Sequence, residues 1–412
     1  MQISLTRLSS ALTPSLPVCK QSSYSRSLQK TAFQHSQTAP HATMAELATA
    51  AAVEEVDGAT LEGGGQLLRV AVALGVGLGK DVRVKNIRAA RSKPGLRPQH
   101  VASLRVAAAV GGVAVAGGVG AVEIVVRGAQ AQATSNDVFE ADAGTAGSTT
   151  LMLQAALPVC LLRRPGATTT LRLKGGTNVP FSPGLDHARL VLAPNLKLMG
   201  IRLDVACIKR GFMPEGGGVL EATVACETIT PLVLDGTSAS PERIDGVVFG
   251  RGDRATADRL RSFLSQKVSQ AFPGCLVILR VDWTPCVKSR GRAPRATLGA
   301  QLALATSSGA TLGADFLDGS KRPNVEALTT TLVAALKQRA AHAGAGVDGQ
   351  TADQLALCMA FASGPSKLRL PKPTCRHLET VMHFVSRFTG AAYDLADEGE
   401  SVVLSCTPRA PS

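Results

Sequence analysis

The sequence predicts an α/β fold, in the broad sense that includes α+β, with several layers of helix and sheet. Short runs rich in Val, Ile and Thr alternate along the chain with longer runs rich in Ala and Leu, which is the pattern of strands alternating with helices. A hydrophobic fraction of 45% over 412 residues supplies a substantial core and room for two or more domains. The tetrapeptide EGGG occurs at Glu62–Gly65 and again at Glu215–Gly218, which suggests internal repetition.

Residue type predicts the individual elements in chain order. The run 66–78, rich in Leu, Val and Ala, predicts a helix after a glycine turn, whereas the second EGGG precedes a strand. The uncharged run 106–122 is shorter than a membrane span and contains glycine pairs, so it predicts the end of a buried helix and no transmembrane segment. Further strands are expected at 82–87, 121–127, 168–173 and 279–281, and further helices at 100–110, 148–156, 258–271, within 347–364 and after the prolines of 370–388.

The composition divides the chain into a leader, a large domain and a smaller insert. Residues 1–45 contain no Asp or Glu and are rich in serine, with a few Arg and Lys, which is typical of a transit peptide for a chloroplast or mitochondrion. The alternatives are a disordered extension without an address, or a start at Met44 that leaves a nuclear or cytoplasmic form. The large domain is predicted from 46–236 and 346–412, and the inserted smaller α/β domain from 237–345, where the composition changes.

Charge and composition narrow the class of partner. The excess of 44 Lys and Arg over 31 Asp and Glu gives a net charge of +13, part of it in the leader, which favours an anionic partner such as nucleic acid or a phosphorylated substrate. With only 3% aromatic residues, RNA contacts are expected to rest mostly on phosphates. The nine cysteines form no CxxC pair and no zinc spacing, so reduced thiols of an intracellular protein are expected. Cys375, two residues from His377, serves either packing or function.

The first glycine turn has the features of a phosphate site. Gly63, Gly64 and Gly65 carry no Cβ, so backbone N–H groups can approach an anion closely, and Glu62 can bind a hard cation. The helix that follows would direct free N–H groups toward the same turn and place Arg69 about two turns from Glu62. The alternative is a glycine turn beside a solvated basic face. GVGLGKD at 75–81 does not complete a Walker motif, because Leu74 replaces the required first glycine and Asp81 replaces Ser or Thr.

A basic loop follows this helix. Arg88 and Arg91 are three residues apart, and Gln99 with His100 closes a segment interrupted by Pro94, Gly95 and Pro98. Guanidinium groups suit phosphate because their planar fork can meet two oxygens at once. The segment is therefore expected to be an ordered anion-binding loop.

Seven blocks in this order resemble the RNA 3'-terminal phosphate cyclases, from about Val56 to the C-terminus. The blocks are LEGGGQLLR, NIRAARSKPGLRPQH, TAGSTTLMLQ, LKGGTNVPFSPGLDH, RGFMPEGGG, ADQLALCMA and CRHLETVMHF. The resemblance implies a large domain of repeated sheet-and-helix units with a smaller inserted domain. It also implies a ligase that uses ATP and a divalent metal (Mg or Mn), attaches AMP to a histidine, passes it to an RNA 3'-phosphate, and releases it as a 2',3'-cyclic phosphate forms.

The resemblance also assigns roles to residues. His377 matches the adenylylated histidine, and Glu62 matches the metal-binding carboxylate. The residues that match the nucleotide and phosphate contacts are Arg69, Arg88, Arg91, Gln99, His100, Gln154 and Asp353. For Gln154 and Asp353 a helix-surface or capping role is the alternative. Gln350 stands where the family often has a tyrosine that stacks on adenine, and Pro180 or Phe181 could cover the base instead.

Two other functions are compatible with this type of chain. A cyclase-like protein of ribosome assembly shares the fold and acts in ribosomal RNA processing without adenylyl transfer, but that branch lacks the histidine that is kept here as His377. An enolpyruvyl transferase is built from similar units and acts on a small metabolite. Labelling by ATP with a marked α-phosphate distinguishes the cyclase from both.

Overall fold

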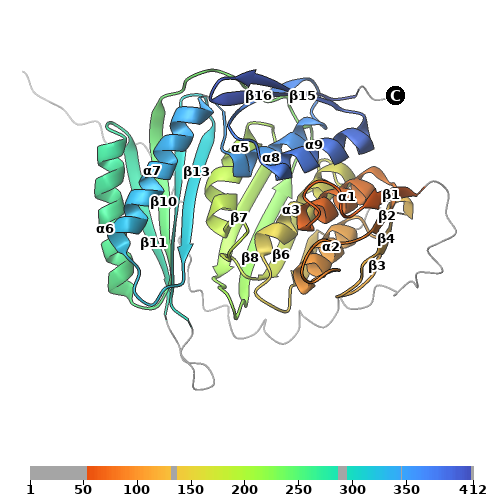
Figure 1. Cartoon of the computed structure of the whole chain (residues 1–412), viewed down its shortest axis with the longest axis horizontal. Helices are drawn as coiled ribbons and strands as arrows, with labels where there is room; N and C mark the ends of the chain where they lie inside the picture. The colour runs from red at the N-terminus through yellow and green to blue at the C-terminus, as the bar shows by residue number, and fades with distance from the viewer. Residues whose placement is uncertain (1–52, 131–136, 286–294, 345, 410–412) are drawn as a thin grey trace, which may run out of the picture. The chain divides into compact units, whose positions relative to one another are not determined.

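The computed structural model describes residues 53–130, 137–285, 295–344 and 346–409. The expected leader 1–45 lies outside these ranges. The described residues form helices and four sheets of four strands each, which confirms the predicted α/β class (Figure 1). None of the helices within these ranges combines the length and apolar character that crossing a membrane requires.

Three of the sheets share one strand order. Counted in chain order, the first two strands of each sheet pair in parallel. The fourth strand along the chain lies between the second and the third and pairs antiparallel with both. The first sheet contains β1 (Glu54–Asp57), β2 (Asp81–Lys85), β4 (Ile124–Arg127) and β3 (Val115–Ala116). The second contains β5 (Val138–Asp142), β6 (Thr169–Gly175), β8 (Gly218–Ala225) and β7 (Arg202–Lys209). The third contains β9 (Val233–Leu234), β14 (Ser366–Pro371), β16 (Ser401–Thr407) and β15 (Ala392–Glu398). The topology is therefore repeated, but the two EGGG turns do not mark the repeat, because the first lies between β1 and α1 and the second between β7 and β8.

Helices connect the strands within each unit. The first unit contributes α1 (Gly65–Leu78) and α2 (Pro98–Val110), and the third contributes α8 (Gly349–Met359) and α9 (Arg376–Thr389). The second contributes α3 (Thr149–Arg163), followed by the short consecutive segments α4 (Leu185–His187), η3 (Ala188–Leu192) and α5 (Ala193–Lys197). A short 3-10 turn, η2 (Gly128–Gln130), follows the first sheet.

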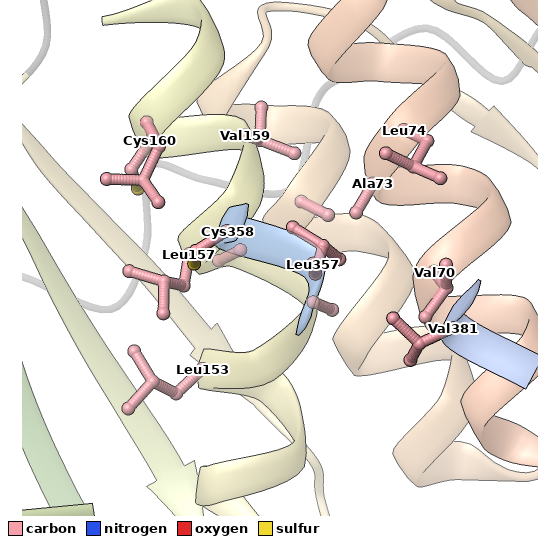
Figure 2. Close-up of a cluster of buried hydrophobic side chains, with 14 of the residues drawn as sticks. Val70, Ala73, Leu74, Leu153, Leu157, Val159, Cys160, Leu357, Cys358 and Val381 are labelled. Atoms are coloured by element: carbon pink, nitrogen blue, oxygen red, sulfur yellow. The ribbon is translucent and has the colours of Figure 1, made fainter. Parts of the chain in front are cut away.

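The helices of the three units bury a common core. Contacts join α1 to α2, α3 and α9, and α8 to α9. Figure 2 shows side chains of these helices packed together, among them Val70, Leu157, Leu357 and Val381. Because Leu, Val and Ala occupy these positions, burial of apolar surface holds segments together that are far apart in the sequence.

The fourth sheet interrupts the third unit, between β9 and α8. It contains β11 (Leu276–Thr284), β10 (Pro241–Arg251), β12 (Thr297–Thr306) and β13 (Thr311–Asp318), in that order. The helices α6 (Arg254–Ala271) and α7 (Val325–Ala343) lie side by side against this sheet and enclose a separate hydrophobic cluster (Figure 1). The domain boundaries at 237 and 345 remain predictions.

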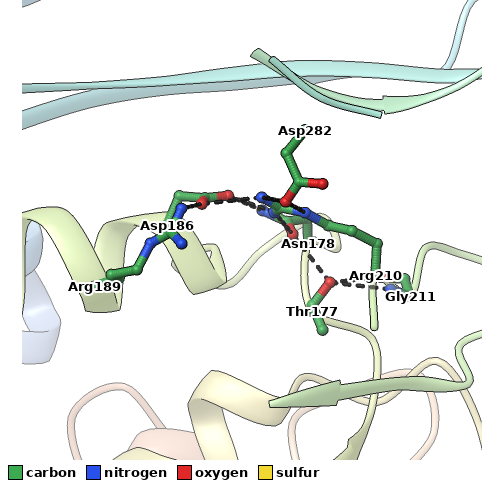
Figure 3. Close-up of polar contacts among 7 residues, drawn as sticks. All are labelled: Thr177, Asn178, Asp186, Arg189, Arg210, Gly211 and Asp282. Atoms are coloured by element: carbon green, nitrogen blue, oxygen red, sulfur yellow. Dashed lines mark hydrogen bonds and ion pairs between the residues drawn. The ribbon is translucent and has the colours of Figure 1, made fainter. Parts of the chain in front are cut away.

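A buried ionic network connects the insert to the second unit (Figure 3). Arg210, directly after β7, is 6% exposed and donates to both Asp186 of α4 and Asp282 of β11. Asn178 accepts from the same guanidinium at 2.8 Å. A buried guanidinium needs such partners, because its desolvation is otherwise costly.

Two sequence expectations need correction. The loop was expected to extend to Gln99 and the helix to begin at His100, but α2 already begins at Pro98. Proline is well tolerated in the first turn of a helix, where its missing N–H has no intrahelical partner anyway. The helix expected to end at Ala156 continues to Arg163 in spite of Pro158, within a run that is largely buried.

Candidate active site

The first EGGG turn brings a carboxylate, a guanidinium and an imidazole together. Gly63 adopts a left-handed φ of 59°, and the N–H of Gly64 donates to Glu62 Oε2 at 2.8 Å. A Cβ at Gly65 would lie 3.0 Å from Arg69 Nη1 and 3.1 Å from His100 Nε2. Because Gly65 has no side chain, the Arg69 guanidinium and the His100 imidazole can both lie close to the start of α1.

Glu62 is the point where the N-terminal and C-terminal parts of the site meet. Its Oε1 lies 3.7 Å from Arg91 Nη2 and 3.9 Å from His377 Nε2, and its side chain is 14% exposed. Arg91 is half-exposed and also reaches the backbone oxygen of Glu62 at 3.4 Å. The structure thus places His377 beside the glycine turn.

His377 lies in the first turn of α9 with half of its side chain exposed to solvent. Hydrogen bonding with the Cys375 thiol raises its pKa, burial opposes this, and the charges of Asp353 and Glu62 raise it further. The same hydrogen bond lowers the pKa of Cys375, which is exposed at the N-cap of the helix. The imidazole is accessible, and the Cys375 hydrogen bond together with the nearby carboxylates favours its protonated form.

His100 has the opposite electrostatic environment. Its Nδ1 accepts the backbone N–H of Arg97 at 3.0 Å, so the neutral ring carries its proton on Nε2, the atom nearest the glycine turn. Burial, together with the charges of Arg88, Arg69 and Arg97, lowers the pKa of His100 to about 4. At neutral pH His100 is therefore a neutral hydrogen-bond donor in a positively charged region.

Arg88 organises the basic loop as well as contributing charge. With a left-handed φ of 54°, it donates from Nη1 to the carbonyl oxygens of Lys93 at 3.1 Å and Gly95 at 2.9 Å. Burial lowers its pKa, and so do the neighbouring charges of Arg97 and Arg91. Like charges repel in this arrangement, and a bound polyanion would relieve the repulsion.

A pocket opens between α1, α3, α8 and α9, and part of its lining belongs to the cluster shown in Figure 2. Asp353 and Gln154 line it, and Gln66 lies between Asp353 and Arg69. Its lining residues are Gln66, Arg69, Val70, Gln154, Leu157, Pro158, Asp353, Gln354, Leu357, Cys358 and Val381. The pocket thus combines apolar walls with a few polar groups.

Gln99, Gln350 and Phe181 lie outside this lining. Gln99 packs against the next block of the chain, because a Cβ at Gly147 would lie 2.8 Å from Gln99 Cβ. Gln350 is exposed at the start of α8. Phe181 is fully exposed with a left-handed φ of 63°.

The sequence analysis missed three polar residues of the site: Gln66, Gln354 and Arg97. Gln66 carried a detectable signal, since it is a single amide at the start of a helix whose remaining residues are apolar apart from Arg69. Gln354 and Arg97 carried none, because a partly buried helix or loop position accepts either residue for many reasons.

Glu62 is the carboxylate best placed to hold a divalent cation. Within the described ranges no group of three or more His, Cys, Asp or Glu side chains could hold a metal ion. Mg²⁺ is commonly bound by one or two carboxylates, water and the phosphates of a substrate. Glu62 at the glycine turn fits this mode, in which the nucleotide completes the coordination.

The fold and the site define a class: an α/β protein of repeated units with a glycine turn that faces basic side chains and an accessible histidine. The family model for RNA 3'-terminal phosphate cyclase matches residues 60–395. The RNA 3'-terminal phosphate cyclase of Caldivirga maquilingensis is 33% identical over 86% of this chain and 97% of its own length. The chain belongs to the RNA 3'-terminal phosphate cyclase family.

Relatives from other sources agree with this membership. The RNA 3'-terminal phosphate cyclase of Drosophila melanogaster is 33% identical over 85% of this chain and 95% of its own length. The solved enolpyruvyl transferase NikO from Streptomyces tendae is 12% identical, covers 87% of this chain and 66% of its own, and has a TM-score of 0.22. A TM-score this low carries no argument about fold or function.

Proposed function

We propose that this protein is an ATP-dependent RNA 3'-terminal phosphate cyclase of the ligase class, with His377 as the covalent AMP acceptor. The observation that carries the proposal is the position of His377: half-exposed, with Nε2 3.9 Å from the carboxylate of the glycine turn. Arg69, Arg91 and His100 surround the same turn. Membership of the family supports the substrate class and the overall cyclisation.

In the proposed first step, an unprotonated nitrogen of His377 attacks the α-phosphorus of ATP. A nitrogen–phosphorus bond forms, the bond from that phosphorus to the bridging oxygen breaks, and pyrophosphate leaves. Arg69, Arg91 and the Nε2–H of His100 are the groups that would hold the departing phosphates. Glu62 would hold a divalent cation, which lowers the negative charge that the nucleophile must approach.

In the second step, an oxygen of the RNA 3'-phosphate attacks the phosphorus of the histidine-bound AMP. The nitrogen–phosphorus bond breaks, His377 is regenerated, and the RNA end carries AMP through a pyrophosphate linkage. In the third step, the neighbouring O2' attacks the 3'-phosphorus, gives up its proton, and AMP leaves. A phosphate monoester is a poor electrophile, and AMP supplies the better leaving group that ring closure needs.

The protonation of His377 sets the pH range of the first step. Its pKa is raised by the Cys375 hydrogen bond and by the charges of Asp353 and Glu62. Attack requires the neutral ring, so the rate of AMP transfer should rise with pH through a value above the ordinary histidine pKa.

Intact-mass analysis after incubation with ATP and Mg²⁺ tests the proposal. The expected result is the addition of one AMP, followed by its loss when RNA with a 3'-phosphate is added and a cyclic phosphate end appears. An RNA with a 3'-hydroxyl is the matched control and should not discharge the enzyme. Binding of RNA without any AMP adduct would favour the alternative, a non-catalytic protein of ribosomal RNA processing.

We further propose that residues 1–45 direct the protein to a chloroplast or mitochondrion, on the basis of their serine-rich composition without acidic residues. A fusion of these residues to a fluorescent protein should accumulate in the organelle. Diffuse nuclear or cytoplasmic fluorescence would contradict the proposal and favour a form that starts at Met44.

A further inference from the structure

We propose that Gln66 is a positioning residue of this site, which fixes Asp353 and Arg69 relative to each other so that one carboxylate oxygen of Asp353 is directed to a ligand in the pocket. This inference rests on the proposed function, since it deepens the account of the same nucleotide site. Gln66 is the second residue of α1, is 8% exposed, and is followed by buried apolar residues. A buried amide is expected to have partners for both of its polar atoms.

The two partners of Gln66 determine its orientation. Its Nε2 donates to Asp353 Oδ2 at 2.7 Å, and its Oε1 accepts from Arg69 Nη2 at 3.2 Å. A carboxylate can only accept and a guanidinium can only donate, so the amide cannot be turned around without losing both hydrogen bonds. Gln66 therefore joins a group of α8 to a group of its own helix in one fixed arrangement.

This arrangement leaves one atom of Asp353 without a partner. Asp353 is 7% exposed and its Oδ1 is buried, yet Oδ1 makes no hydrogen bond to any described residue. The residue lines the pocket together with Gln154 and Gln354. A buried carboxylate oxygen without a partner is costly, so its presence in a pocket indicates that a bound donor group completes it.

The ligand group that meets Oδ1 is expected to be a neutral hydrogen-bond donor. A phosphate would be repelled by a carboxylate, whereas a hydroxyl or amino group of a nucleoside can donate to it. The phosphates would lie instead toward Arg69, His100 and Glu62 at the glycine turn. Gln66 lies between these two halves of the site, and its hydrogen bonds fix the distance between them.

A donor–acceptor exchange tests this role. Gln66→Glu places a carboxylate against Asp353, and Gln66→Met removes both hydrogen bonds at similar volume. Asp353→Asn alone can satisfy Gln66 with its oxygen, which turns an NH₂ group toward the pocket. The double variant Gln66→Glu with Asp353→Asn reverses the hydrogen bond and forces the asparagine oxygen back toward the pocket.

The initial rate of AMP uptake is measured for each variant, with thermal unfolding and RNA binding as checks on the fold. We expect each of the three single variants to lose about 100-fold in rate, because misplacement by an ångström costs that much. The double variant should be about tenfold faster than either of its component single variants. RNA binding should stay near that of the unmodified protein.

The inference is wrong if Gln66→Met takes up AMP at the unmodified rate, or if the double variant is no faster than its component single variants. The unmodified protein in the same assay separates the two proposals. If it takes up no AMP at all, the proposed function fails. If it does and Gln66→Met matches it, only the role of Gln66 fails.

Discussion

The two EGGG turns have the same sequence and different surroundings. Glu62–Gly65 leads into a helix, and its carboxylate faces His377 and Arg91. Glu215–Gly218 leads into β8, and Glu215 pairs with Arg251 of β10 at 2.6 Å. The tetrapeptide encodes a turn without side chains in its last three positions, and the segments brought against it decide whether the space admits a ligand or another part of the backbone.

The last glycine of each turn makes the difference clear. A Cβ at Gly65 would meet the ends of the Arg69 and His100 side chains, at 3.0 and 3.1 Å. A Cβ at Gly218 would meet the backbone of Gly211, with 2.4 Å to its nitrogen and 2.7 Å to its Cα. The first turn is open to movable polar groups, and the second is closed by main chain.

The largest effect is expected from removing His377, which lies beside the first turn and not beside the second. His377→Ala should abolish AMP uptake, a loss of more than about a thousandfold, because no other group replaces the nucleophile. His383→Ala is the matched control, since His383 is exposed on the same helix and packs against Phe384. Intact mass after ATP treatment reports both. Full labelling of the His377 variant would show that another residue accepts AMP.

The next largest effect is expected from replacing Glu62, with Glu215 of the second turn as the comparison. Glu62→Ala should lower metal-dependent AMP uptake about 100-fold with little change in RNA binding, because the cation loses its protein ligand. Glu215→Ala should leave uptake unchanged and cost less than about 1 kcal/mol of stability, since Glu215 is 48% exposed in its ion pair. Labelling rates and denaturant unfolding measure the two. An equal loss of uptake and RNA binding in Glu62→Ala would contradict the metal role.

The last glycines should respond in opposite ways. Gly65→Ala displaces Arg69 or His100 and should cost about tenfold in AMP uptake with stability nearly unchanged, because the contacted atoms are the ends of side chains. Gly218→Ala forces backbone apart and should cost about 2 to 3 kcal/mol of stability. A Gly218 variant as stable as the unmodified protein would mean that the second turn is not closed as described.

The smallest expected effect is on the stability of the fold at acidic pH. The pKa of His100 falls from the ordinary 6.5 to about 4 on folding, so the unfolded chain binds more protons between these values and stability falls as pH decreases through that window. Between pH 7 and 5 the loss should be roughly 1 to 2 kcal/mol. His100→Gln should flatten this part of the stability profile, measured by unfolding at several pH values. An unchanged slope would assign the acid sensitivity to other groups.

Local sequence patterns predicted the helices and strands well. Contacts between distant segments were predicted only through the resemblance to a known family. The helix after the first turn and the strand after the second follow from residue type, and both are present. The meeting of Glu62 with His377 depends on the packing of α1 against α9, for which spacing in the sequence holds no information. It was expected only because both residues matched one family.

The pairing of Gln66 with Asp353 shows the limit more clearly. The sequence placed Gln66 at the start of a helix and Asp353 inside another, and a surface or capping role was the alternative for Asp353. Their hydrogen bond forms because the helix packing brings α1 and α8 to the same pocket, and burial then makes an unpaired amide costly. Gln66 therefore pairs with Asp353 because both side chains are buried in the fold. The local sequence at these positions does not reveal that burial.

Arg210 has a consequence for how the insert can respond to substrate. Its guanidinium is shared between Asp186 of the second unit and Asp282 of the insert. Swinging the insert away would leave a buried cation with part of its counter-charge removed, which is unfavourable. We therefore expect RNA to find the insert already held in place, so that little ordering entropy is spent on domain closure when the two associate.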